Sequence, residues 1–442
     1  MLPELLQKLA HEVIELIEKQ AGRGTLQKVQ RMYIKHEIKE FTYNEGSISF
    51  MASFPTVIKD EWDWKSLSEL MNEARNLPIY KKCYQVIADE YGVSESQAEY
   101  WLSRFVMEFI VRYLNNNIDS GKIIDLIFTF IGDLEDTPKK WKIETWLRGV
   151  WLEVNEINIG KGIVIRRPQP SDFEYERPLD FYPVFEQPII EHPSAILEIH
   201  KRLKIKPYIY DEHEKLIILL QLYKLGSVSI IQTRWKAKSI LQKGGGTSRP
   251  LQMWTTTYKY SLTKEDEDNL LKFVNGLLPL LPTDEYGRPL PSDPIGIAIL
   301  RYQDALLKPE TIENKIAYGI MGLEALYLKA REREELSHRL AQRIAKIFGA
   351  YGEPPVKIYN LIKEGYEIRS CFVHGSPLHS ENPQKMKNLL DNILELLRKS
   401  IFIFLQVKKE KEKDEFLGLI DNALLDNQAF EKLENVLSKY VK

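Results

Sequence analysis

The spacing of apolar residues changes twice along this sequence, and the changes divide the chain into three parts. Apolar residues recur every three or four positions in 2–19 and again in 61–134, which predicts helices. Between these stretches, residues 25–57 are rich in β-branched and aromatic side chains and turn at 44–46, which predicts a hairpin. We therefore expect a mostly helical N-terminal domain with a β-hairpin at 1–137.

In the middle of the chain, apolar and polar residues alternate instead. Strand-like runs are interleaved with helical stretches, so we expect a mixed α/β domain with a sensing or regulatory role at 138–290. Prolines gathered between 279 and 294 mark a boundary, and an all-α helical bundle is expected at 291–442. The expected class is thus α+β and multidomain. The expected strands lie within 146–167 (with a turn at 158–162), 194–203, 227–240 and 252–262, and the helices within 211–225, 264–281, 295–329, 332–348, 355–374, 382–407 and 413–440.

Composition narrows the classes of function. The 442 residues include 61 Lys plus Arg and 63 Asp plus Glu, a net charge of −2, so any nucleic-acid binding must come from a local patch. Two distant cysteines, Cys83 and Cys371, form neither a disulfide framework nor a zinc motif. Every apolar run is far shorter than the roughly 20 residues of a membrane span, and charges interrupt the N-terminus. We expect a cytoplasmic protein with no membrane partner.

Several short motifs favour ordinary structural roles. Gly244 to Gly246 follow their lysine instead of preceding it, so a hairpin tip fits better than a phosphate loop. Residues 91–102 have the rhythm of a helix-turn-helix, but the second helix lacks cations, and helix packing fits better than a transcription regulator. No HExxH or GxSxG motif occurs, so metal and serine chemistry are unsupported and no cofactor is expected.

An arginine followed by a histidine five to seven positions later occurs four times. Three pairs lie in strand-like or highly charged segments: Arg31 with His36, and Arg331 or Arg333 with His338. The fourth pair, Arg369 and His374, encloses a mostly apolar stretch that we expect to anchor a helix in the core. Five positions on a helix correspond to about 140°, so a regular helix would point the two side chains apart. Because Gly375 follows, we expect His374 at the C-cap, where the chain swings it back.

The segment YEIRSCFVHG at 366–375 resembles the catalytic helix of the Apea-like family of HEPN domains. That family combines a tyrosine, an arginine-serine pair and a valine-histidine-glycine triplet. The stretches 320–328 and 338–347 are similar to its first two helices, with Glu324 and Arg343 at the characteristic places. The resemblance covers about 295–442. The supporting site residues that it implies are Ser370, Glu324, Tyr366 and Arg343.

The resemblance implies a metal-independent endoribonuclease that acts as a homodimer. In such proteins two catalytic helices face each other, so Arg369 would grip the scissile phosphate of RNA and His374 of both protomers would share proton transfer. The RNA 2′-hydroxyl would attack and leave a 2′,3′-cyclic phosphate. The implied role is a toxin-like effector of antiviral defence and abortive infection, in which the N-terminal part would sense an unidentified trigger or regulatory partner. Ser370 stands where many HEPN enzymes outside this branch have asparagine.

Two alternatives remain open at this point. The C-terminal domain could be a non-catalytic HEPN module for dimerisation and for RNA or nucleotide binding. Arg369 would then pair structurally with Glu324 or Glu367, and His374 would only cap its helix. Separately, Arg31 with Tyr33, or Arg234 with Trp235 and Lys236, could hold single-stranded RNA, although ordinary strand positions explain both groups better. Exposure of Arg369 and His374 in a shared two-fold cleft would favour the nuclease.

Overall fold

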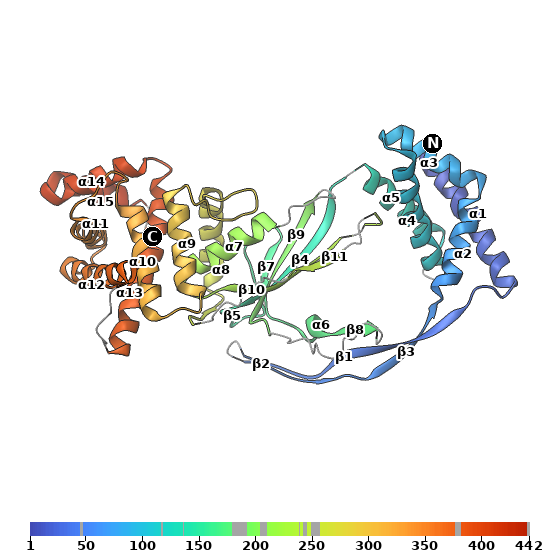
Figure 1. Ribbon diagram of the computed structural model, residues 1–442, viewed down its shortest axis with the longest axis horizontal. Coiled ribbons are helices and arrows are strands. Elements are labelled where there is room, and N and C mark those ends of the chain that lie inside the picture. Colours follow the sequence, from blue (N-terminus) through green and yellow to red (C-terminus); the bar gives the residue numbers. More distant parts are fainter. Residues whose placement is uncertain are drawn as a thin grey trace.

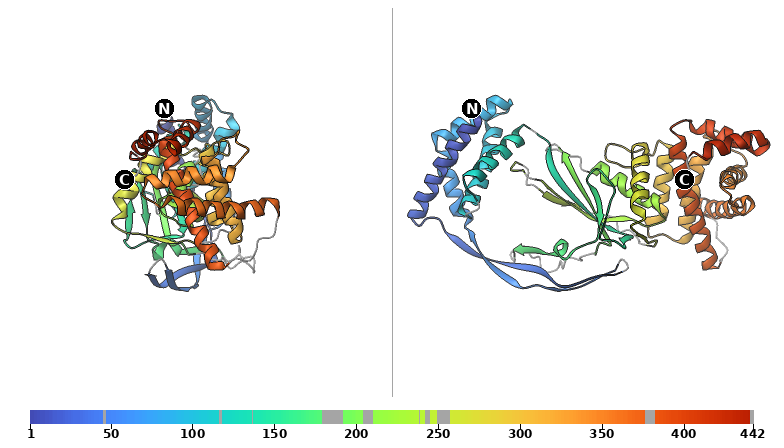
Figure 2. Two further views of the ribbon diagram at one scale, coloured as in Figure 1. Left: turned by 90° about the vertical axis from the view of Figure 1, so that its left-hand side faces the viewer. Right: turned by 180° about the vertical axis from the view of Figure 1, so that it is seen from behind.

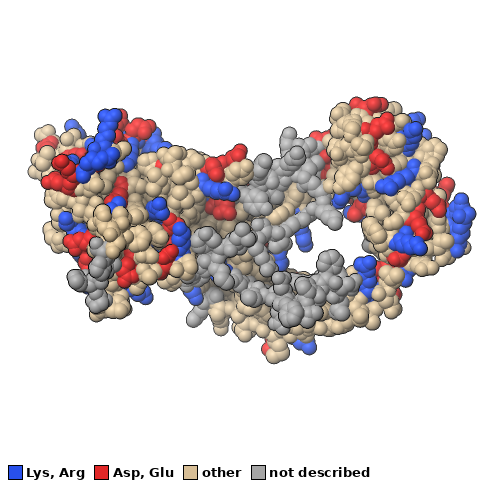
Figure 3. Space-filling model, viewed as in Figure 1, with Lys and Arg blue, Asp and Glu red and all other residues tan. Residues whose placement is uncertain are grey.

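Helices form both ends of the molecule and sheets lie between them, which confirms the expected α+β class. The computed structural model describes residues 1–44, 47–115, 118–135, 137–178, 192–203, 210–237, 239–241, 245–248, 257–375 and 382–439. It is elongated, with the N-terminal helices at one end and the C-terminal helices at the other (Figures 1 and 3).

The N-terminal helices form a bundle with its own core. Short polar side chains cap three of them: Asp63 accepts from the backbone N–H of Ser66, Ser94 from that of Gln97, and Asp119 from that of Lys122. The turn expected within 91–102 is present, but Ala98 and Leu102 of its second helix are buried in the bundle core, which favours helix packing. The helices are α1 Leu2–Gly22, α2 Trp64–Arg75, α3 Pro78–Tyr91, α4 Glu95–Leu114 and α5 Ser120–Leu134.

A long β-arm leaves this bundle and reaches the middle of the molecule (Figure 1). Strand β1, Lys28–Asn44, pairs antiparallel with β3, Thr56–Trp62, along its first half and with β2, Ser47–Ser53, along its second. The expected hairpin is therefore found, although residues 45–46 of its turn lie outside the described residues. Strand β8, Tyr175–Pro178, pairs with β1 from a distant part of the chain.

An antiparallel sheet of six strands forms the centre, in the order β11-β10-β4-β9-β7-β6. The expected strands at 194–203 and 227–240 are present as β9 and β10, whereas 252–256 lie outside the described residues and the strand β12 covers only the end of 252–262. The bounds are β4 Lys139–Arg148, β6 Glu156–Asn158, β7 Ile163–Arg166, β9 Ala195–Leu203, β10 Ser229–Ala237 and β11 Gly245–Ser248, while β5 Val150–Leu152 and β12 Tyr260–Leu262 form a parallel pair. Gly244 lies outside the described residues, and Gly245 and Gly246 belong to β11.

The two faces of this sheet have different partners. One face carries apolar side chains such as Ile143, Leu197 and Ile199 and belongs to a core that includes α7, Tyr210–Tyr223, and α8, Asp266–Leu277. This alternation is what an antiparallel sheet with one buried face requires. The other face is partly covered by the β-arm and by the short helix α6, Pro170–Phe173. A 3₁₀ turn, Leu278–Leu280, follows α8.

Seven helices were found among the described residues of the C-terminal bundle. The long helix expected at 295–329 is wrong, because Pro309 cannot continue a helix and Thr311 caps a new one. The core is continuous with that of the sheet across the proline-rich segment. The helices are α9 Pro294–Leu307, α10 Ile312–Tyr327, α11 Leu336–Ala350, α12 Pro355–His374, α13 Pro383–Val407, α14 Lys413–Leu425 and α15 Asn427–Leu437.

None of the described helices combines the length and the apolar character that crossing a membrane demands.

Candidate functional site

Helix α12 carries the predicted site and has the bounds expected from its sequence. Pro355 begins it, and Gly375 ends it in the left-handed conformation, with φ 66° and its N–H donating to the carbonyl of Cys371. Glycine adopts this conformation at little cost, which is why helices commonly end at one. His374 is the last helical residue, one position before the C-cap at which we expected it.

Arg369 is held by a carboxylate from helix α10. Its Nη2 lies 3.0 Å and its Nε 3.2 Å from Oε2 of Glu324, and its guanidinium lies 5.6 Å from the centre of the Tyr366 ring. Burial raises the pKa of Glu324, while Arg369 and the Tyr366 hydroxyl oppose that rise. Glu324, rather than Glu367, is thus the partner of Arg369. Of the five site residues predicted besides His374, three are therefore in contact with one another: Arg369, Glu324 and Tyr366.

Arg369 keeps capacity to bind an anion. Its side chain is 23% exposed, and within the described part of the chain its hydrogen bonds go to one carboxylate oxygen of Glu324 only. A guanidinium has five N–H donors, so donors remain for a phosphate group.

Arg369 and His374 do not meet within one chain. Helix α12 is regular through His374, so their directions differ by about 140°, and the expected swing of His374 back toward Arg369 is not seen. The side chain of His374 is exposed and makes no hydrogen bond or ion pair within the described residues. One protomer therefore presents these two side chains on different sides of the same helix.

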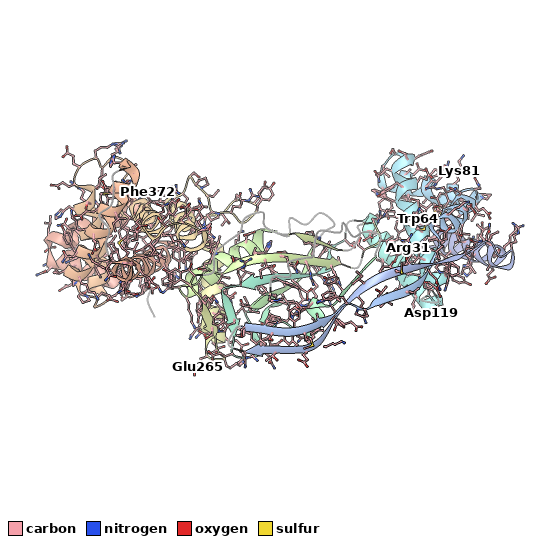
Figure 4. The ribbon with its side chains drawn as sticks, turned by 60° about the horizontal axis from the view of Figure 1, so that its bottom comes forward. Arg31, Trp64, Lys81, Asp119, Glu265 and Phe372 are labelled. Carbon is pink, nitrogen blue, oxygen red and sulfur yellow. The ribbon has the colours of Figure 1, made fainter. Side chains whose placement is uncertain are left out.

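The apolar stretch between Arg369 and His374 is not a core anchor, contrary to our expectation. The side of α12 that packs inward carries Ile362, Gly365 and Ile368, whereas Phe372 is 38% and Val373 46% exposed. Both lie in the last turn of α12, and Figure 4 labels Phe372 on the C-terminal bundle, at the opposite end of the molecule from Arg31. Ser370 is half-buried.

Tyr318 of α10 is the neighbour of Phe372 that the sequence did not reveal. The two rings lie edge to face with centres 6.2 Å apart, and Arg301 and Lys308 lie 5.9 and 5.6 Å from the centre of the Tyr318 ring. This pairing joins residues from separate helices, and no spacing in the sequence indicates it.

Arg343 lies in a separate buried cluster. Its side chain is only 1% exposed and binds Asp421 through Nε at 2.7 Å and Glu332 through Nη2 at 2.6 Å. Nη1 also donates to the carbonyl of Tyr327 at 2.7 Å. These contacts tie α11 to α14 and to the segment after α10. The structure therefore shows Arg343 supporting the bundle, with no contact to Arg369 or His374.

The histidines of the other arginine–histidine pairs make contacts typical of a structural role. His36 is buried, with Nδ1 2.6 Å from the carbonyl oxygen of Phe173 and its ring stacked on Tyr175. Nδ1 of His338 lies 2.8 Å from the hydroxyl of Tyr359. Among the described residues, no three His, Cys, Asp or Glu side chains gather as metal ligands.

Comparisons with known proteins leave the family open: no family model, no curated protein and no solved structure matches this chain.

Proposed function

We propose that the C-terminal bundle is an Apea-like HEPN endoribonuclease whose active site is completed by a second copy of the chain. The observation that carries the proposal is the end of α12. The His374 imidazole is exposed and has no partner among the described residues. Less than two helical turns before it, Glu324 holds Arg369 in place, and N–H donors of Arg369 remain for a ligand. These are the groups that metal-independent RNA cleavage needs.

The chemistry follows from RNA itself. The 2′-oxygen attacks the adjacent phosphorus while one imidazole takes the 2′-hydroxyl proton, and the P–O5′ bond breaks as a second imidazolium donates a proton to O5′. The products are a 2′,3′-cyclic phosphate and a 5′-hydroxyl. Arg369 stabilises the extra negative charge on the phosphorane. One chain has one such histidine at this helix end, so the second proton carrier comes from the partner protomer.

Two features support the two-fold arrangement. Phe372 and Val373 expose apolar surface directly beside His374, and a second copy of the same surface would cover it in an isologous contact. Such a contact would bring both His374 side chains to one cleft, which the single chain does not do. We keep defence and abortive infection as the expected role, with the N-terminal part restraining the nuclease or sensing its trigger.

The second candidate is a non-catalytic HEPN module for dimerisation and RNA or nucleotide binding. The Arg369–Glu324 ion pair favours it, because a partly buried arginine beside a carboxylate is a common structural device. On this interpretation His374 only ends its helix.

Cleavage of end-labelled total RNA in excess EDTA separates the two candidates. We expect the purified protein to cleave, His374→Ala to lose activity by at least about 100-fold, as removal of a general acid-base group does, and His338→Ala to retain it. His338 is a matched control because it is also exposed and lies in the same bundle. Equal activity in all three proteins would contradict the nuclease, and no cleavage by any of them would favour the binding module.

The dimer is tested separately with Val373→Asp. Val373 is 46% exposed, so a charge at this position should disrupt the contact between copies and abolish cleavage while each chain stays folded. Sedimentation velocity gives the oligomeric state and circular dichroism the stability. A variant that remains dimeric and active would contradict the proposed contact.

A further inference from the structure

The sheet face that looks toward the β-arm changes character along its strands. Register places Trp146 beside Ile196, Glu144 beside Glu198, Lys142 beside His200 and Lys140 beside Arg202 on strands β4 and β9. Strand β10 continues these rows with Arg234 opposite Glu144 and Lys236 opposite Lys142. Because side chains alternate between faces, all of these residues share one face. It runs from apolar through mixed charge to basic.

The apolar end of this face is covered. Trp146 and Ile196 pack with Phe173 of α6 in a small core that also contacts Phe41 and Phe50 of the β-arm. The arm therefore docks on this half of the face, whereas Lys140, Arg202 and Lys236 at the other end are exposed.

In the middle row the charges satisfy one another. Arg166 lies 3.0 Å from Glu144, 2.8 Å from Asp172 and 2.9 Å from Glu198, and its side chain is 13% exposed. Arg166 and its neighbours lower the pKa of Glu198 to about 2, against the effect of burial. Arg166 and the three carboxylates neutralise one another, so we assign this network a structural role.

The other end of this face, here called the basic end, carries the cations Lys140, Arg202 and Lys236. No described carboxylate neutralises their charges. Lys140, Arg202 and Lys236 are exposed, and within the described residues none of their side chains forms an ion pair or hydrogen bond. Only Lys142 is neutralised, by Glu144 at 2.9 Å and Glu198 at 3.1 Å. The three remaining cations come from three adjacent strands.

Lys140 and Arg202 lie directly opposite each other here, whereas the Lys142 that lies opposite Lys236 is neutralised by Glu144 and Glu198. Like charges opposite one another on antiparallel strands are destabilising, and alternating signs would stabilise the same sheet. A bound polyanion would remove this electrostatic repulsion between neighbouring strands. Folding stability alone therefore does not explain why cations face each other here.

The basic end lies next to the N-terminal bundle. The segment after β10 contacts α5, where the backbone N–H of Ile240 donates to Asp133 at 2.6 Å, and β4 begins just after α5. Figures 1 and 2 place α5 on the side of the bundle that faces the sheet.

We propose that this basic end of the sheet face, formed by Lys140, Arg202 and Lys236, binds the phosphate backbone of a single-stranded nucleic acid. The cations span three strands, about 10 Å, which suits one phosphate backbone. An open antiparallel sheet face is also a common platform for single strands. The site is separate from α12, so it does not depend on whether Arg369 and His374 cleave RNA.

Fluorescence anisotropy with a labelled 20-residue oligo(U) tests the proposal, with oligo(dT) to distinguish RNA from DNA. The full chain carries His374→Ala throughout, so that the RNA stays intact. We expect Lys140→Gln/Arg202→Gln to weaken binding about tenfold or more at low salt. The slope of log affinity against log salt should fall by about 1.4, because each lost contact to a single strand removes about 0.7.

The matched control is Lys81→Gln/Lys82→Gln, which removes the same charge from two exposed lysines of α3. It should leave binding unchanged. A third variant, Lys140→Glu, creates an opposite-charged pair with Arg202 and should raise the thermal midpoint by about 1 to 3 °C while it weakens binding. That combination separates a lost ligand contact from misfolding.

Four results would overturn the proposal: no binding of either oligonucleotide at 50 mM salt, equal loss in the control, tighter binding of a duplex, or a Lys140→Glu protein that binds as well as its parent. Binding of oligo(U) and oligo(dT) alike would support a backbone contact, and preference for oligo(U) would assign the site to RNA.

Discussion

At the scale of single residues, the Arg343 cluster shows how burial assigns a role. Glu332 and Asp421 both face Arg343, whose side chain is almost fully enclosed. Hydrogen bonding to Arg343 is the main cause that lowers the pKa of Glu332 from 4.5 to about 2. A carboxyl group whose pKa is lowered by folding stabilises the folded state only while it is ionised.

This pKa predicts an acid-dependent loss of stability. Glu332 contributes above the pH at which it ionises in the unfolded chain, near 4.5, and the contribution disappears as pH falls toward about 2. We therefore expect Glu332→Gln to lower the thermal midpoint at pH 7, and the gap from wild type to close by about pH 2. Circular dichroism melts across this range measure it. A gap that is the same at pH 7 and pH 2 would contradict the assignment.

Residue types at the site were predictable, but their geometry was not. The combination at 366–375 identified Arg369 and Tyr366, the stretch 320–328 added Glu324, and these three residues lie together. The sequence could not show that α12 stays regular to His374 or that Phe372 is exposed, because both depend on where neighbouring helices end. Arg343 was grouped with the site from its place in a motif, whereas its partners come from distant segments.

At the scale of elements, glycines set the close packing of the C-terminal bundle. A Cβ added at Gly365 of α12 would lie 2.6 Å from Ile393 and 2.9 Å from Ile320, so α10, α12 and α13 meet there with no spare space. A Cβ added at Gly418 of α14 would meet nothing within 4 Å.

The two glycines should therefore respond oppositely to alanine. Gly365→Ala should destabilise the protein by about 1 to 3 kcal/mol, because overpacking outweighs the gain in helix propensity. Gly418→Ala should stabilise it by roughly 0.5 to 1 kcal/mol, since only the propensity gain remains. Urea unfolding measures both. Stabilisation by both substitutions would show that the bundle yields at Gly365 and that the close contact is not required.

Elements were predictable where their signals are local. Pro355 and Gly375 bound α12 as expected, and the turn at 158–162 separates β6 from β7. The long β-arm was only partly predicted, because β3 and β8 are defined by pairing with β1, and β8 comes from a distant part of the chain. Pairing between strands that are distant in the sequence produces no periodic pattern of residues that could predict it.

At the scale of the whole molecule, two large cores divide the chain unequally. The N-terminal bundle has one core, to which Ile240 and its neighbour Leu241 are the only described contributors beyond residue 134. The second core runs without interruption from the central sheet through the C-terminal bundle. Segments that share a core unfold together, whereas separate cores permit separate transitions.

Calorimetry should therefore show two unfolding transitions. Ile240→Ala should lower only the transition of the N-terminal bundle, because Ile240 is 6% exposed and lies in that core. The transition of the sheet and C-terminal bundle should keep its midpoint. A single transition with equal calorimetric and van't Hoff enthalpies would contradict this division.

The chemistry of the RNA ends tests the proposed metal-independent nuclease. RNA is cut by the wild-type protein in excess EDTA, and the new ends are examined. We expect 5′-hydroxyl ends that accept phosphate from polynucleotide kinase without prior dephosphorylation, and 3′ ends blocked by a 2′,3′-cyclic phosphate. Neither end should form with His374→Ala, whereas both should form with His338→Ala. Fragments with 5′-phosphate ends, or cleavage that survives His374→Ala, would contradict it.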